Sequence, residues 1–192
     1  MQRARRPAVI AVVSLAAGVS VAPAAAHDCS EPGKSFRINR GVAGYEDCHL
    51  TAWVVHYYYP RDHDPKWLAL DFAVQGKVGE AMTFGRDEVH VVHPDGSRTP
   101  LISQETYLQQ RSSLLPLQLQ MQGGDRRSPG NCALKLDFFV DRGLRRSLAD
   151  VSQYRCMQGN LFFAARTGDW ERGSYELDVG GGVGLRMPFE IE

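Results

Sequence analysis

The sequence predicts a mostly β domain: an antiparallel β-sandwich, immunoglobulin-like in the broad sense, with one or two short helices and a signal peptide before it. Three observations lead to this prediction. Apolar residues alternate with polar or small ones in several segments, which is typical of strands. Glycine and proline turn signals separate these segments. Four cysteines follow an export pattern, and an even number of cysteines in an exported chain favours disulfides.

Residues 1–26 have the pattern of a cleavable signal peptide. Three arginines and no acid open the segment, a small and apolar run follows, and the segment ends in Ala24, Ala25 and Ala26. These are the three parts of a secretory signal. The run is rich in alanine and shorter than the roughly 20 strongly apolar residues of a membrane-spanning helix. We therefore expect cleavage after Ala24 or Ala26, and a single periplasmic or secreted domain formed by residues 27–192.

The clearest strand pattern lies at residues 68–74, where large apolar side chains alternate with alanine and aspartate. Residues 115–122 alternate leucine and methionine with proline and glutamine, and residues 132–138 repeat an alternating pattern after a polar loop. The shorter candidates are residues 53–59, 87–92, 161–165, 175–179 and 183–191. Glycines 180–182 predict the turn of a final hairpin, and residues 93–96 predict a tight turn. Together these segments predict about nine strands.

Two segments predict short helices. Residues 103–114 offer Ser103 as an N-cap, and Pro116 follows as a stop signal. Residues 142–152 place Leu144, Leu148 and Val151 on one side of a helix, at spacings of four and three.

The four cysteines are Cys29, Cys48, Cys132 and Cys156. They predict two disulfides, for which the sequence alone leaves three connectivities. We favour sequential pairing, Cys29 with Cys48 and Cys132 with Cys156, because short loops close most easily. The chain contains no Cys-x-x-Cys, so neither a thioredoxin-type redox site nor a cysteine-based zinc site is indicated.

Residues 148–156 resemble the immunoglobulin run that ends in a tyrosine corner, in which a tyrosine stands two residues before the second cysteine. Here these residues are Tyr154 and Cys156. The resemblance implies a partner cysteine far upstream with a tryptophan between the two. Cys132 is too near, with no tryptophan between it and Cys156, whereas Cys48 is too far away. The sandwich prediction therefore rests on the number of strands.

Charge and missing motifs narrow the functional classes. The chain has 22 basic and 22 acidic residues, and loss of a leader with three arginines leaves a net charge of −3 with histidine neutral. No basic stripe suits nucleic acid, no later segment is apolar enough to span a bilayer, and we expect a monomer. The Gly-x-Ser-x-Gly and His-Glu-x-x-His motifs are absent, so the sequence does not support an enzyme. The sequence does not exclude the paired carboxylates of a hydrolase, because two such residues are close in space and can be far apart in the chain.

Two histidines are candidate metal ligands. If cleavage falls after Ala26, His27 carries both a free amine and an imidazole, which together chelate copper. His90 would share one face of a strand with Glu88, and a carboxylate beside an imidazole can orient it or share a metal. The alternative for His90 is the polar outer face of a half-buried strand. Apart from copper as an alternative, no cofactor is expected.

The most unusual composition lies at residues 57–67, where aromatic residues and prolines flank a charged loop. If exposed, Tyr58 and Trp67 could stack on sugar rings or anchor a protein partner, with His63 in the loop between them. The alternative is that the aromatic rings pack inward and the charges form a solvated hairpin tip. Residues Tyr58, His63 and Trp67 are nevertheless the favoured ligand-binding surface.

The sequence therefore predicts an exported binding or interaction module for a protein or carbohydrate ligand. Three alternatives stay open: a copper-binding protein that uses His27, a hydrolase with dispersed carboxylates, and an accessory protein of the cell envelope.

Overall fold

Strands dominate the computed structural model, which describes residues 31–39, 41–57, 64–123 and 132–191. The mostly β prediction is confirmed, and helices are few. The predicted signal peptide lies outside the described residues, so export stays a prediction. The immunoglobulin-like type of the fold also stays a prediction.

The larger sheet has the strand order β1-β2-β3-β4-β10-β8. Its strands are β1 (Lys34–Asn39), β2 (Val42–Glu46), β3 (Leu50–Tyr57), β4 (Trp67–Gly76), β10 (Cys156–Ala164) and β8 (Leu134–Lys135). Neighbouring strands are antiparallel except β10 and β8, which run parallel. The longest pairing joins β4 and β10, from Trp67 opposite Ala164 to Gln75 opposite Cys156. Strands β1 and β8 are therefore the edges of this sheet.

The second sheet has the order β12-β11-β6-β7, and two further strands pair beside it. Its strands are β12 (Leu185–Ile191), β11 (Gly173–Val179), β6 (Val89–Val92) and β7 (Arg98–Pro100). The separate pair is β5 (Met82–Gly85) with β9 (Leu148–Val151). The described sheets stay open, with β12 and β7 as the edges of the second sheet.

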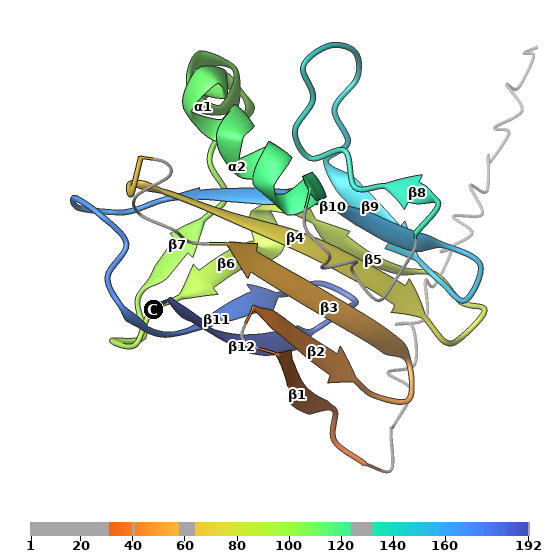
Figure 1. Cartoon of the computed structure of the whole chain (residues 1–192). Helices are drawn as coiled ribbons and strands as arrows, with labels where there is room; N and C mark the ends of the chain where they lie inside the picture. Colours follow the sequence, from red (N-terminus) through yellow and green to blue (C-terminus); the bar gives the residue numbers. More distant parts are fainter. Residues whose placement is uncertain (1–30, 40, 58–63, 124–131, 192) are drawn as a thin grey trace, which may run out of the picture.

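The two larger sheets lie in layers, one over the other, and share one hydrophobic core (Figure 1). Alternate side chains of each strand point into this core, because successive residues of a strand face opposite sides of the sheet. Val54 and Phe72 enter it from the larger sheet, and Leu177 and Met187 enter it from the second. Phe84 of β5 is 1% exposed and fills the space between them. The packing of the two sheets is therefore sandwich-like.

Two helices cover the outer face of the larger sheet (Figure 1). The helix α1 (Gln104–Gln109) begins as predicted, since Ser103 Oγ accepts a hydrogen bond from the Thr106 amide at 2.9 Å. The next helix, α2 (Arg111–Gly123), buries Leu114 and Leu117 in a second hydrophobic cluster with residues of β3, β4 and β10. In the described part of the chain, no helix is long and apolar enough to cross a membrane.

The predicted strand at residues 115–122 is wrong, because these residues belong to α2. Leu114 and Leu117 are both fully buried, and their spacing of three places them on one side of a helix. Leu115 is 36% exposed, as expected of the opposite side. The leucines of this segment fit both periods, and contact with the sheet selects the helix. Pro116 lies inside α2 and does not end it as predicted.

The predicted helix at residues 142–152 is also wrong. Residues 141–147 have no regular secondary structure, and β9 follows at Leu148–Val151. Leu144 is 97% exposed and Leu148 is 60% exposed, so the apolar side expected for a helix is not buried. Tyr154 is 82% exposed, which rules out the internal contact of a tyrosine corner. Residues 132–138, predicted as one strand, contribute only β8 at Leu134–Lys135.

The turns predicted from glycine are confirmed. Strands β11 and β12 form the final hairpin, and Gly181 and Gly184 between them have φ of 64° and 56°. Gly96 has φ of 81° and donates its amide to the His93 carbonyl at 2.9 Å. Such backbone angles favour glycine over residues with a side chain.

One of the two predicted disulfides lies within the described residues. Cys132 and Cys156 are bonded, with their Cα atoms 4.8 Å apart. The bridge joins the segment before β8 to the start of β10. Cys48 is also disulfide-bonded, while Cys29, its predicted partner, lies outside the described residues.

Candidate binding groove

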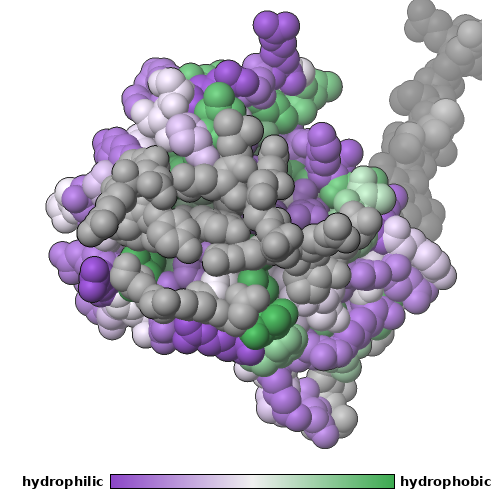
Figure 2. All heavy atoms as spheres, viewed as in Figure 1, coloured by the Kyte–Doolittle hydropathy of each residue, from purple (hydrophilic) through white to green (hydrophobic). Residues whose placement is uncertain are grey.

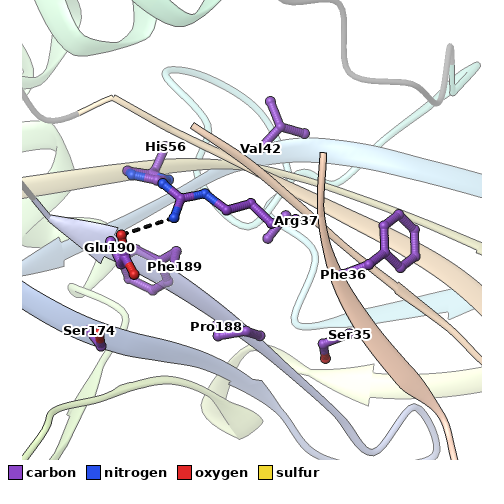
Figure 3. A pocket seen from close by; sticks show the side chains of 10 residues that line it. Ser35, Phe36, Arg37, Val42, His56, Ser174, Pro188, Phe189 and Glu190 are labelled. Carbon is purple, nitrogen blue, oxygen red and sulfur yellow. Dashed lines mark hydrogen bonds and ion pairs between the residues drawn. The ribbon is translucent and has the colours of Figure 1, made fainter. Parts of the chain in front are cut away.

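A groove of about 160 Å³ opens between the edge strands of the two sheets (Figure 3). Strands β1, β2 and β3 form one wall, and β11 and β12 form the other. The residues that line it are Ser35, Phe36, Arg37, Val42, Ala43, His56, Ser174, Pro188, Phe189 and Glu190. The groove thus joins segments from the two ends of the described chain.

An ion pair and a hydrogen bond connect β1 with β12. Arg37 Nη1 lies 3.0 Å from Glu190 Oε2, and the two side chains are about half exposed. Figure 3 shows this pair reaching across the groove. Ser35 Oγ donates to the Arg186 carbonyl of β12 at 2.8 Å. Because half-exposed ion pairs contribute only about 0–1 kcal/mol, the Arg37–Glu190 pair can separate at little cost.

The inner end of the groove rests on a row of aromatic rings. Phe189 stacks against Tyr175 with ring centres 5.8 Å apart, and its other neighbour is His56 at 5.4 Å. Tyr175 in turn contacts Trp170 at 5.5 Å and His93 at 5.3 Å. The Tyr175 hydroxyl donates to a backbone carbonyl at 2.9 Å, and burial raises the pKa of this phenol. Phe189 and His56 thus line the groove, and the other aromatic rings pack behind Phe189.

The rim of the groove is the edge strand β1, which exposes two large apolar side chains. Phe36 is 40% exposed and Ile38 is 46% exposed. Figure 2 shows hydrophobic atoms on the surface over this strand. The Phe36 ring lies directly on the backbone of Gly44 in β2, where an added Cβ would come within 2.5 Å of the ring. Such an exposed apolar edge is a ready place for another strand to pair.

The groove combines polar and charged groups with apolar walls. Ser35 and Ser174 supply hydroxyls, Arg37 and Glu190 supply one charge of each sign, and apolar side chains form the walls. Pockets that bind ligands commonly combine apolar walls with a few polar groups that fix orientation.

The sequence-predicted ligand-binding residues do not line this groove. Tyr58 and His63 lie outside the described residues. Trp67 is 3% exposed and packs in the second hydrophobic cluster beneath the helices, so the condition of exposure is not met at this residue. The Lys66 ammonium lies 5.1 Å from its ring centre. Trp67 is buried because β4 begins at this residue and turns this face of the sheet toward α2.

The predicted metal ligands are not brought together in the described part of the chain. His27 lies outside it, so copper binding stays a prediction. His90 is half-buried on β6, where it stands opposite Asp178 of β11. Glu88 belongs to the short 3-10 helix η1 (Arg86–Glu88) and not to a strand beside His90. The described residues hold no group of three or more His, Cys, Asp or Glu side chains that could bind a metal ion.

Two carboxylates, the half-buried Asp71 and the buried Asp178, bear on the alternative of a hydrolase. Asp71 accepts a hydrogen bond from Gln158 Nε2 at 2.8 Å, and burial raises its pKa. Asp178 is 8% exposed and pairs with Arg98 and Arg186. They lie on different sheets, and each is held by its own partners. The hydrolase alternative stays a prediction.

Sequence reasoning missed the groove because its two walls are far apart in the chain. A usable signal existed in β1, where Phe36 and Ile38 alternate with Ser35 and Arg37 in the manner of a strand. The contact between β1 and β12 depends on tertiary packing, and no local sequence pattern predicts it. Comparisons of the chain with protein-family models, with curated proteins and with solved structures found no match.

Proposed function

We propose that this protein is an exported binding module that holds an extended segment of a partner protein along β1, at the mouth of the groove. The observation that carries the proposal is the edge strand itself. Strand β1 pairs with β2 on one side, ends the larger sheet, and exposes Phe36 and Ile38. Binding by strand addition uses main-chain hydrogen bonds for affinity and alternate side chains for specificity.

The groove supports this mode of binding through its two kinds of wall. Alternate side chains of an added strand would face opposite sides. One set would lie toward Phe36 and Ile38, and the other toward the groove between Arg37 and Phe189. The Arg37–Glu190 pair offers one charge of each sign to polar side chains of the incoming segment.

The expected compartment and scaffold fit this function. The arginine-led, alanine-rich pattern of residues 1–26 and the bonded Cys132–Cys156 pair support a periplasmic or secreted location. Two open sheets with a shared core support a sandwich, immunoglobulin-like in the broad sense, as the scaffold. A monomer would leave β1 free for a partner.

The experiment is selection of peptides from a random display library on the purified protein, followed by affinity measurement on two matched variants. The test variant is Phe36→Ser with Ile38→Ser. The control is Leu108→Ser with Leu115→Ser, which removes two comparably exposed leucines from the helices. We expect the test variant to bind the peptides roughly tenfold or more weakly, because it lacks the apolar side-chain area that a bound peptide would bury. The control variant should bind like the original protein.

Two results would count against the proposal. Peptides that bind both variants equally well would place the site away from β1. Tight binding of oligosaccharides, with no peptide selected, would favour the carbohydrate ligand instead.

A further inference from the structure

A second surface lies at the opposite edge of the larger sheet, in the segment between β8 and β9. We call residues 141–147 the arginine loop. Figure 1 shows this segment standing out from the sheets beside the helices. It contains Arg142, Arg145 and Arg146, which are all exposed. In the described part of the chain, none of these three forms an ion pair.

The base of the arginine loop is held firmly on both sides. Asp141 accepts two hydrogen bonds of 2.6 Å from Arg111 and a third of 3.1 Å from the Tyr107 hydroxyl. On the other side, the Arg146 amide donates to the Asp137 carbonyl at 3.0 Å. The Ser147 carbonyl accepts from the Arg86 amide at 3.0 Å. The loop is therefore presented on a fixed base.

The tip of the arginine loop carries an apolar side chain with almost no cover. Leu144 is 97% exposed. The preceding Gly143 has φ of 94°, and nothing lies within 4 Å of the position that a Cβ would take. A leucine at the end of an anchored loop, with arginines on either side of it, is an amphipathic tip.

Positive charge at the loop extends into the fold beneath it. The Arg86 side chain is 7% exposed, donates to the carbonyls of Ile102 and Phe138, and lies 4.8 Å from the Phe139 ring centre. Burial, with the added repulsion of Arg145, lowers the pKa of Arg86. The carboxylate at the loop base, Asp141, is engaged by Arg111. Residues 141–147 thus carry three arginines and one carboxylate, so the loop itself has a net positive charge.

We propose that the arginine loop docks on a bilayer with anionic headgroups, with Leu144 entering the interface and Arg142, Arg145 and Arg146 contacting lipid phosphates. Interfacial binding combines an apolar side chain at the boundary with basic residues that attract anionic lipids. A second copy of this chain is a poor occupant, because two such tips would repel each other. The area of one loop tip makes the docking weak and reversible.

The test is sedimentation of the protein with phosphatidylcholine vesicles, with and without phosphatidylglycerol. We expect binding to the anionic vesicles, little binding to the neutral ones, and loss of binding at high salt. The variant Arg142→Gln/Arg145→Gln/Arg146→Gln should bind about 100-fold more weakly, at about fivefold for each arginine. The charge-matched control changes Lys135, Arg166 and Arg172 to glutamine and should bind normally. All variants have the same N-terminal residues, so a difference in vesicle binding between them is due to the substituted side chains.

A fluorescence measurement separates insertion from charge attraction alone. The variant Leu144→Trp should shift its emission to shorter wavelength when anionic vesicles are added, whereas Leu108→Trp on α1 should not. Unchanged vesicle binding by the arginine variant, or no emission shift for Leu144→Trp, would overturn the proposal. Binding to the soluble polyanion heparin without binding to vesicles would also overturn it, in favour of an acidic polymer.

Discussion

Removal of the bridge between Cys132 and Cys156 should destabilise the protein by an amount that the structure sets. The two cysteines are 24 residues apart in sequence. Closing a loop of that length in the unfolded chain costs an entropy equivalent to about 3.5 kcal/mol at 25 °C. Strand β8, next to Cys132, pairs with β10 through Leu134 and Lys135, which are both exposed. Side-chain burial therefore adds little to hold β8 itself, and the nearest buried side chain of this segment is that of Leu136.

The perturbation is the double variant Cys132→Ser/Cys156→Ser, which leaves the disulfide of Cys48 in place. Both replaced side chains are half-buried, so the cavity left behind is small. Urea unfolding under oxidising conditions should show a free energy of unfolding lower by about 3.5 kcal/mol. The midpoint of thermal unfolding should fall by about 7–14 °C for a chain of this size.

The same unfolding curves also give the m-value. If the bridge acts on the unfolded chain, its loss lets that chain expand, and the m-value should rise. A loss below about 1 kcal/mol with an unchanged m-value would refute the entropic account.

Three further predictions concern single side chains. Burial lowers the pKa of His93, whose imidazole lies 2.7 Å from Thr99 Oγ1. As the pH drops, the unfolded state therefore binds the proton before the folded state does, and the free energy of unfolding should fall below about pH 6.5. The variant His93→Gln should lose less stability over this pH range in acid unfolding curves. Burial raises the pKa of Asp71, so the folded state prefers the protonated acid. Asp71→Asn should be more stable than the original protein near neutral pH in urea, and the difference should vanish below about pH 4. Phe84 is 1% exposed and meets Phe72 and Phe138 edge to face, so Phe84→Ala should cost about 3–5 kcal/mol in the same assay; a cost below about 1 kcal/mol would contradict this packing.

Local patterns predicted the parts of the fold in which strand burial is regular. The alternation at residues 68–74 corresponds to β4, whose inward side chains Leu68, Leu70, Phe72 and Val74 are all fully buried. The three glycines at 180–182 lie in the turn of the β11–β12 hairpin. In both places, the local pattern was sufficient to predict the element.

The errors come from places where distant contacts decide the structure. The leucines of α2, Leu117 among them, fit the period of a strand as well as that of a helix. Packing on the larger sheet selects the helix. Leu144 looks like part of an apolar helix face, but it lies on a loop whose base is held by Arg111, a residue of another element. The groove needs β1 beside β12, and the residues Arg37 and Glu190 that span it are 153 positions apart. No local sequence pattern predicts a contact between residues that are so far apart in the chain.

Amide hydrogen exchange of residues 34–39 can show whether β1 accepts an added strand. Exchange is measured with and without a saturating peptide selected on the protein. We expect slower exchange within β1, where amides at the sheet edge gain a hydrogen-bond partner, and unchanged exchange in α1 (Gln104–Gln109). Unchanged exchange throughout β1, with protection elsewhere, would show that the peptide does not pair with β1.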